Sequence, residues 1–186
     1  MNLSKKIISS MLVLCLFPAF STTPEELSYT NINIGYLSGE TDDVNIDGYV
    51  VRGNWSLNKH FYLIGQYNAI DYKNYPADFN RKVFGLGAHR PVSDSFDWVS
   101  GLTYINVNSE NNNYDGYEVL TGLRGYLTDK LEIDLQAFYN DFVEDSGELG
   151  YYAEVRWLFS ENLSLGLKYR SVDEVSTAAL DLGFGF

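Results

Sequence analysis

Most of this 186-residue sequence alternates apolar and polar residues in segments of about ten, and this pattern limits the folds open to it. A period of two residues is typical of a β-strand with two different faces, because successive side chains point to opposite sides. The pattern predicts an all-β chain, a single antiparallel transmembrane β-barrel of ten strands, with eight strands as the alternative if two weaker segments merge. The expected strands span residues 27–38, 46–57, 61–71, 80–90, 96–107, 116–127, 131–142, 149–159, 163–171 and 177–186.

The two faces are clearest in the segment 131–142. Its odd positions are apolar, among them Leu131 and Leu135, and its even positions are mostly polar, among them Glu132 and Asp134. A soluble β-sandwich would turn the apolar face inward, whereas a transmembrane barrel would turn it toward lipid. Two further observations favour the barrel.

The first observation is that short and longer connections alternate along the chain. Antiparallel outer-membrane barrels have short periplasmic turns and longer extracellular loops. The short connections are 58–60, 91–95, 128–130 and 160–162, and those between them, mostly longer and more acidic, are 39–45, 72–79, 108–115, 143–148 and 172–176.

The second observation is the distribution of outward-facing aromatic residues. An apolar band flanked by two aromatic girdles is the expected exterior of a barrel in a bilayer, and a soluble barrel has no reason to sort aromatics in this way. Near the short turns lie Trp55, Phe61, Trp98, Trp157, Phe159 and Phe186, and near the longer loops lie Tyr36, Tyr49, Tyr67, Tyr104, Tyr117, Tyr139, Tyr151 and Tyr169.

Residues 1–21 are typical of a cleaved signal peptide. Lys5 and Lys6 precede an apolar run over residues 11–20, which is too short to span a bilayer comfortably and ends in small residues at the −3 and −1 positions. Cleavage after Ser21 would leave residues 22–186 as a single barrel domain. Cys15, the only cysteine, lies in the removed segment, so disulfides and cysteine chemistry are excluded from the mature chain.

Composition excludes further classes. Apolar residues make up 45% of the sequence and aromatic residues 16%, which argues against disorder. The 13 Lys and Arg residues are outnumbered by 25 Asp and Glu residues. A nucleic-acid surface needs clustered basic residues, so the sequence predicts no nucleic-acid partner.

The chain ends on an aromatic residue with apolar residues at alternating positions before it. Phe184 and Phe186 fit the terminal strand signature recognised by the barrel assembly machinery of Gram-negative bacteria. We therefore expect this machinery to be a partner during biogenesis.

Charged residues occupy the face expected to line the lumen. If the short turns set the register, Leu127 faces Leu131 and Arg124 lies opposite Asp134, while Phe159 faces Leu163 and Glu154 lies opposite Lys168. Such residues are either structural ion pairs or the lining of a narrow pore, and ten strands leave little room once long side chains point inward. The other inward charges are Arg52, Glu118, Glu132, Arg156, Arg170 and Asp181.

Catalytic and ligand-binding candidates are few. His60 lies in a short turn and His89 at the turn end of the fourth strand, where it would face Asp97. Barrel enzymes carry their histidine toward the outside of the cell, so we predict no enzymatic activity and no cofactor. Acidic clusters in the longer loops are interpreted as solvated surface or as sites for divalent cations that bridge lipopolysaccharide phosphates. These clusters are Asp42–Asp43, Asp141–Glu144–Asp145–Glu148 and Asp173–Glu174.

Several short motifs resemble one family of small barrels. The chain is similar to the outer-membrane proteins known as diffusible-signal-factor-regulated or plant-immunity-activator proteins, over most of residues 27–186. This resemblance implies the fold and the compartment, and implies no catalytic or ligand-binding residue. Gly87-Ala88-His89-Arg90 departs from the family pattern. The motifs are Asp47-Gly48-Tyr49, Phe61-Tyr62-Leu63-Ile64-Gly65, Phe84-Gly85-Leu86-Gly87, Asp115-Gly116-Tyr117 and Gly122-Leu123-Arg124-Gly125.

Taken together, these features predict a monomeric, non-enzymatic barrel in the cell outer membrane, in contact with its lipid and lipopolysaccharide. The expected role is in envelope structure or surface interaction. The alternative is a narrow cation-preferring channel for small solutes, because acidic loops at the mouth favour cations.

Overall fold

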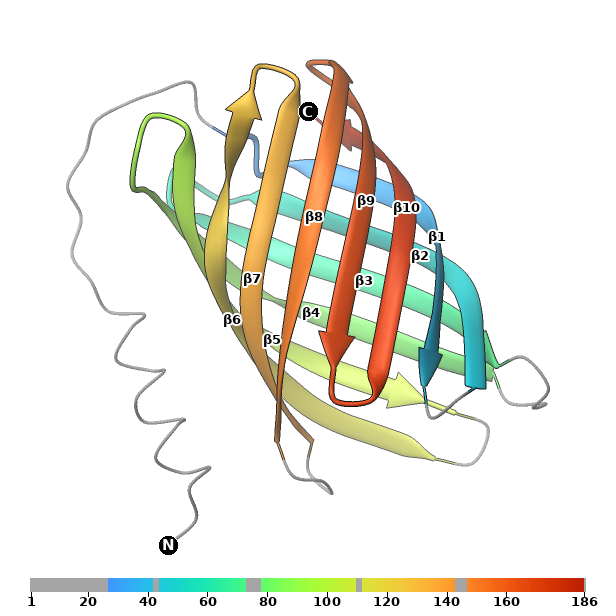
Figure 1. The fold of residues 1–186 in the computed structure, drawn as a ribbon. Helices are drawn as coiled ribbons and strands as arrows, with labels where there is room; N and C mark the ends of the chain where they lie inside the picture. The colour runs from blue at the N-terminus through green and yellow to red at the C-terminus, as the bar shows by residue number, and fades with distance from the viewer. Residues whose placement is uncertain (1–26, 42–43, 73–77, 110–111, 143–146, 186) are drawn as a thin grey trace, which may run out of the picture.

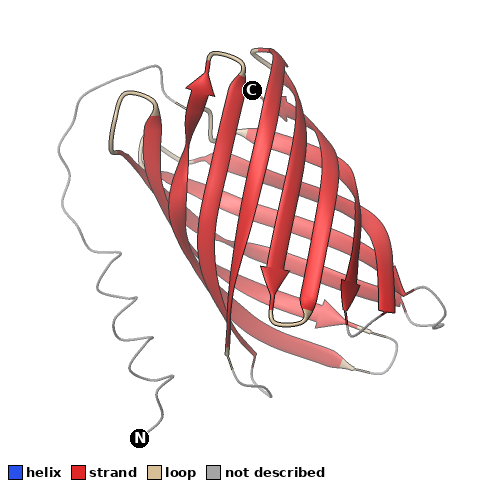
Figure 2. Ribbon diagram, in the orientation of Figure 1, coloured by secondary structure: helices blue, strands red, loops and turns tan. Residues whose placement is uncertain are grey.

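The computed structural model describes residues 27–41, 44–72, 78–109, 112–142 and 147–185. The expected signal peptide and Phe186 lie outside these residues. Within them every regular element is a strand (Figure 2), and no helix is long and apolar enough to cross a membrane. The strands are β1 (Asn31–Thr41), β2 (Val44–Ser56), β3 (Phe61–Tyr72), β4 (Asp78–Pro91), β5 (Phe96–Asn108), β6 (Asn113–Thr128), β7 (Leu131–Phe142), β8 (Glu148–Ser160), β9 (Leu163–Val172) and β10 (Val175–Gly185).

The ten strands form one closed antiparallel barrel (Figure 1), which confirms the predicted fold and strand count. Each strand pairs with its neighbours in sequence, and β1 pairs with β10 from Asn31 opposite Gly185 to Glu40 opposite Ser176. Closure leaves no strand edge with unpaired backbone groups, which a strand protein needs in a bilayer.

The hairpin register agrees with the prediction along the strands but differs at two turns. Arg124 lies opposite Asp134 and Glu154 opposite Lys168, as expected. The pairings of Leu127 with Leu131 and of Phe159 with Leu163 are wrong. A bulge at each turn leaves one residue unpaired, so that Thr128 lies opposite Leu131 and Ser160 opposite Leu163.

The two ends of the barrel differ less than expected. At the end where β1 begins and β10 finishes, here called the turn end, the connections are 57–60, 92–95, 129–130 and 161–162. At the opposite end, the loop end, they are 42–43, 73–77, 109–112, 143–147 and 173–174. Several strands continue into the expected loops, and two of the five loops are two residues long.

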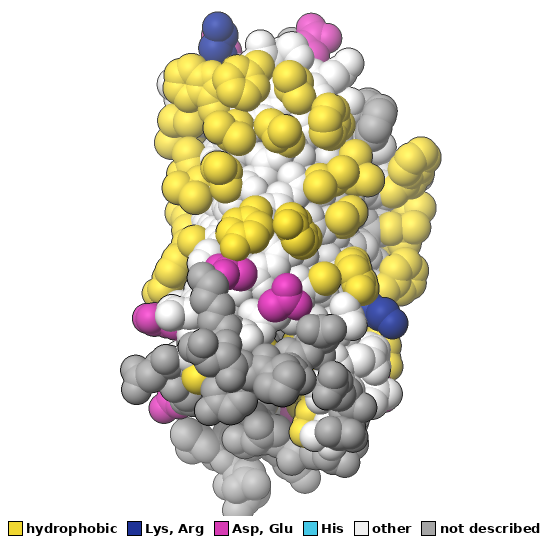
Figure 3. All heavy atoms as spheres, turned by 90° about the vertical axis from the view of Figure 1, so that its right-hand side faces the viewer, with side chains coloured by type: hydrophobic (Ala, Val, Ile, Leu, Met, Phe, Trp, Pro, Cys, Tyr) yellow, Lys and Arg dark blue, Asp and Glu magenta, His cyan; other side chains and the backbone are white. Residues whose placement is uncertain are grey.

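The outer wall is apolar. Leu102, at the middle of β5, has 58% of its surface exposed, and Trp55, near the turn end, has 63% exposed. Figure 3 shows this apolar band on one side of the barrel, with acidic side chains below it toward the loop end. A closed barrel with such an exterior has the surface of a transmembrane β-barrel.

Tyrosines border this band at the loop end and donate hydrogen bonds to polar side chains. The hydroxyl of Tyr67 donates to Asn80 at 2.6 Å, and that of Tyr117 donates to Asp141 at 2.6 Å. Tyrosine suits a membrane interface because its ring is apolar while its hydroxyl needs a polar partner. Tyr139 keeps the outward phase of Leu135 on β7, but it is covered, with 7% of its surface exposed.

Candidate functional site

The barrel lumen holds a network of ion pairs that crosses from one wall to the other. Arg52 on β2 donates two hydrogen bonds of 2.6 Å to the two carboxylate oxygens of Glu154 on β8, and a third of 2.7 Å to Asp181 on β10. Glu154 also accepts a bond of 2.5 Å from Arg156. One carboxylate therefore holds two guanidinium groups from different strands.

The network continues toward the turn end. Arg156 lies 3.5 Å from Glu132, and the same Glu132 oxygen accepts a hydrogen bond of 2.7 Å from Nε of Arg124. Six of the predicted lumen residues thus form one belt inside the barrel: Arg52, Arg124, Glu132, Glu154, Arg156 and Asp181.

A second group of charges centres on Glu118 of β6. Its carboxylate accepts a hydrogen bond of 2.7 Å from Arg170 and lies 3.5 Å from Arg81. The Arg170 guanidinium also lies over the ring of Phe138, 3.7 Å from its centroid. Arg81 was absent from the predicted set, although it shares the inward phase of Gly85 and Gly87 on the same strand and could have been found from it.

The opposed pairs predicted from the register do not form the closest ion pairs. Arg124 binds Glu132 rather than Asp134, and Glu154 binds Arg52 and Arg156 rather than Lys168. Arg124 reaches Glu132 diagonally on the adjacent strand, Arg156 lies on the same strand as Glu154, and Arg52 reaches Glu154 across the lumen. The register was correct, but it places only neighbours within the wall.

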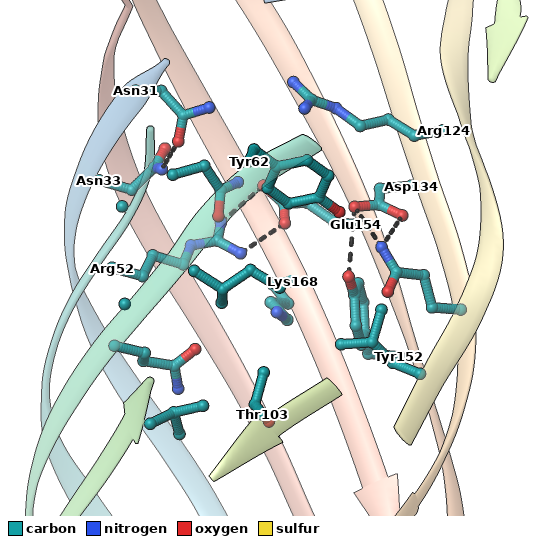
Figure 4. Close-up of a pocket in the computed structure, with 18 of the residues that line it drawn as sticks. Asn31, Asn33, Arg52, Tyr62, Thr103, Arg124, Asp134, Tyr152, Glu154 and Lys168 are labelled. Carbon is teal, nitrogen blue, oxygen red and sulfur yellow. Dashed lines mark hydrogen bonds and ion pairs between the residues drawn. The ribbon is translucent and has the colours of Figure 1, made fainter. Parts of the chain in front are cut away.

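Asp134 and Lys168 instead meet around Tyr152. Asp134 accepts hydrogen bonds of 2.8 and 3.0 Å from Gln136 and one of 3.3 Å from the Tyr152 hydroxyl. The Lys168 ammonium lies over the Tyr152 ring, 3.8 Å from its centroid. Figure 4 shows these side chains pointing into the same space as Arg52 and Glu154.

Two cavities lie in the lumen beside these charges. The larger has a volume of about 90 Å³ and the smaller about 50 Å³. Both are lined by Arg52, Gln66, Lys168 and Arg170. The larger one is lined by six cationic side chains (Arg52, Arg81, Arg124, Arg156, Lys168, Arg170) and three acidic ones (Glu118, Asp134, Glu154).

Residues 27–30 occupy the turn end of the lumen, so the expectation that the first strand starts at residue 27 is wrong. Leu27 and Tyr29 are buried and form a cluster with Tyr62 and Val99 from the wall. The backbone carbonyl of Ser28 accepts a hydrogen bond of 3.1 Å from Arg124. The segment therefore plugs this end of the barrel and contacts the ion-pair network directly.

The predicted contact between His89 and Asp97 is present. Nδ1 of His89 lies 2.8 Å from an Asp97 oxygen, and the hydroxyl of Tyr29 donates to the same oxygen at 2.8 Å. The His89 ring also stacks on Tyr29 with 3.8 Å between ring centroids. His89 is thus enclosed between Tyr29 and the barrel wall.

The acidic loops were expected to be solvated or to bind divalent cations. Asp141 accepts the hydrogen bond from Tyr117, and Asp115 accepts one from Tyr104. Asp42, Asp43, Glu144 and Asp145 lie outside the described residues. In the part of the chain that is described, no group of three or more His, Cys, Asp or Glu side chains is placed to hold a metal ion.

Comparison with solved structures identifies the kind of barrel. An outer-membrane channel from Pseudomonas putida F1 matches with a TM-score of 0.50 at 8% identity, over 89% of this chain and 100% of that one. The fold is that of a small outer-membrane β-barrel. The KdgM porin matches at 0.49 and 10% identity over 84% and 99% of the two chains, and Neisserial surface protein A matches at 0.39 and 15% over 84% and 96%.

The sequence itself has no such match. No protein-family model matches the chain, and no curated protein matches it. The structural likeness is therefore a likeness of fold.

Proposed function

We propose that the protein is a non-enzymatic barrel of the cell outer membrane, exported by a cleaved signal peptide over residues 1–21, with a role in envelope structure or surface interaction. The observation that supports this proposal is the set of side chains that obstruct the lumen. Residues 27–30 seal the turn end with buried apolar side chains, and the belt from Asp181 through Arg52, Glu154 and Glu132 to Arg124 crosses the barrel behind them.

The proposed surroundings follow from the exterior. The apolar band supports contact with outer-membrane lipid and lipopolysaccharide, and Phe184, which is exposed on β10, supports recognition by the barrel assembly machinery. The same proposal includes three further points. The protein is a monomer, its acidic loops bind divalent cations, and it is related to the family whose motifs it resembles.

Membrane insertion is tested by Leu102→Arg. Because Leu102 lies outward at the middle of β5, the substitution is expected to lower the free energy of unfolding in lipid vesicles by about 2–4 kcal/mol. Asp129→Arg, in the exposed turn between β6 and β7, is the control and is expected to have an effect below about 0.5 kcal/mol. Equal effects of the two substitutions would contradict a lipid-facing wall.

The closed lumen is tested by recording from the refolded residues 22–186 in a planar bilayer. Folding is verified first, by the heat-dependent shift of the barrel on a gel. We expect no discrete conductance steps, because the plug and the ion-pair belt obstruct the path. Regular steps from folded protein would overturn this proposal.

A narrow channel is the second candidate, and the lumen cavities favour it. The lining of the larger cavity holds twice as many cationic as acidic side chains, so conductance steps would prefer anions. The cation preference expected from the acidic loops would give the opposite sign of reversal potential in asymmetric salt. The same recording therefore distinguishes the two selectivities.

A further inference from the structure

Lys168 projects from β9 into both lumen cavities with its charge unbalanced by a direct partner. An ammonium has three N–H donors. Within the described ranges, the Lys168 ammonium forms no hydrogen bond or ion pair. It makes a cation–π contact with the Tyr152 ring. An enclosed cation is costly unless an anion or hydrogen-bond acceptors compensate it.

Two of the three carboxylates on this cavity are already shared, and the third, Asp134, is held by Gln136 and the Tyr152 hydroxyl. Glu154 binds both Arg52 and Arg156, and Glu118 faces both Arg170 and Arg81. The space between these groups and Lys168 therefore has an excess of positive charge, although the protein as a whole is acidic.

Other polar atoms on the same cavity also lack partners. Thr103 on β5 has 1% of its surface exposed, and its hydroxyl has no hydrogen-bond partner among the described residues. Nε of Arg52 likewise has an unused N–H. Figure 4 shows Thr103, Lys168 and Arg52 around one space. Donors from three strands thus border the cavity, and the side-chain oxygens of Asn33 and Gln136 on the same lining also lack a hydrogen-bond partner among the described residues.

The size of the space limits what fits. At roughly 10–15 Å³ for each water, the cavity of about 90 Å³ takes a group of several heavy atoms and no more. Access is from the loop end, because residues 27–30 fill the turn end and the smaller cavity extends along Thr177 and Ala179 toward the connection 173–174.

We propose that the lumen cavity between Lys168, Arg52 and Thr103 is a binding site for a small oxyanion, a phosphate or a carboxylate group. The ammonium supplies the neutralising charge, Arg52 and Thr103 supply further donors, and Arg170 and Arg81 raise the local positive potential. The site is independent of whether the barrel conducts.

The test is isothermal titration calorimetry on refolded residues 22–186 in lipid nanodiscs. The titrants are inorganic phosphate and acetate, in a chloride buffer free of other oxyanions. Saturable one-site binding of either anion is expected, and the tighter titrant identifies the group that the site prefers. Lys168→Gln is expected to weaken this binding about tenfold or more, because a hydrogen bond to a charged group is lost.

Three variants keep the test decisive. Lys168→Arg retains the charge and is expected to retain binding, whereas Lys130→Gln, in an exposed turn, is expected to leave it unchanged. Thr103→Val, which is expected to weaken binding about fivefold, replaces Lys168→Gln if that variant fails to show the heat-dependent gel shift. Absence of saturable heat with both anions, or equal affinity of the wild type and Lys168→Gln, would overturn the site. Conductance through the barrel would overturn the proposal of a closed lumen and would leave the proposed anion site standing.

Discussion

Replacing Glu154 with glutamine is expected to lower the free energy of unfolding by about 3–5 kcal/mol. The carboxylate accepts hydrogen bonds from both Arg52 and Arg156, and all three side chains lie within the barrel. Glutamine keeps the size of the side chain but leaves two guanidinium groups without their common counter-charge. The measurement is reversible urea unfolding in lipid vesicles, followed by tryptophan fluorescence.

Glu161→Gln is the matched control for this substitution. Glu161 lies exposed in the turn between β8 and β9, so its neutralisation is expected to change the free energy by less than about 0.5 kcal/mol. A double-mutant cycle then asks which cation matters. The coupling of Glu154 to Arg52 is expected to exceed its coupling to Lys168, which lies opposite it in the sheet. The reverse order would contradict the network across the lumen.

The contrast between Arg52 and Lys168 also explains how far the sequence predicts this site. Alternation defines which residues of a strand point inward, and hairpin register defines which residues of adjacent strands lie opposite each other. Both predictions are confirmed for Glu154 and Lys168. Arg52 and Glu154 are 102 residues apart and on strands that are not neighbours, so neither rule relates them.

The turns and loops were predicted less well because their geometry leaves no periodic signal. The bulges at Leu127 and Phe159 insert one unpaired residue each, and the apolar character of both residues fits a continuing strand equally well. At the loop end, polar residues at inward positions are as typical of a strand that lines a lumen as of a loop, so the pattern does not mark where a strand ends. The strands accordingly extend beyond the expected limits there.

The alternation predicts that segment 27–30 belongs to the first strand, for a related reason. Leu27 and Tyr29 continue the inward phase of Asn31 and Asn33, so the alternation is unbroken. One feature argues against a place for Leu27 in the barrel wall. Leu27 is apolar, whereas the next inward residues of the strand, Asn31 and Asn33, are polar. In the structure the chain leaves the wall at this point and its inward residues fill the lumen.

Replacing Tyr29 with alanine is expected to lower the free energy of unfolding by about 3–5 kcal/mol, the usual cost of removing a buried aromatic side chain. Only 3% of its surface is exposed. Its hydroxyl donates to Asp97 at 2.8 Å, its ring stacks on His89, and the Arg124 guanidinium lies 4.7 Å from the ring centroid. Urea unfolding in vesicles measures the change.

Two further variants separate the contributions within the plug. Tyr29→Phe keeps the ring and loses the hydrogen bond to Asp97, so it is expected to cost about 1 kcal/mol. Ser28→Ala alters the exposed neighbour and is expected to cost less than about 0.5 kcal/mol. If Tyr29→Ala were no more destabilising than Ser28→Ala, residues 27–30 would not fill the barrel in lipid. The turn end would then be open, and closure of the lumen would depend on the ion-pair belt alone.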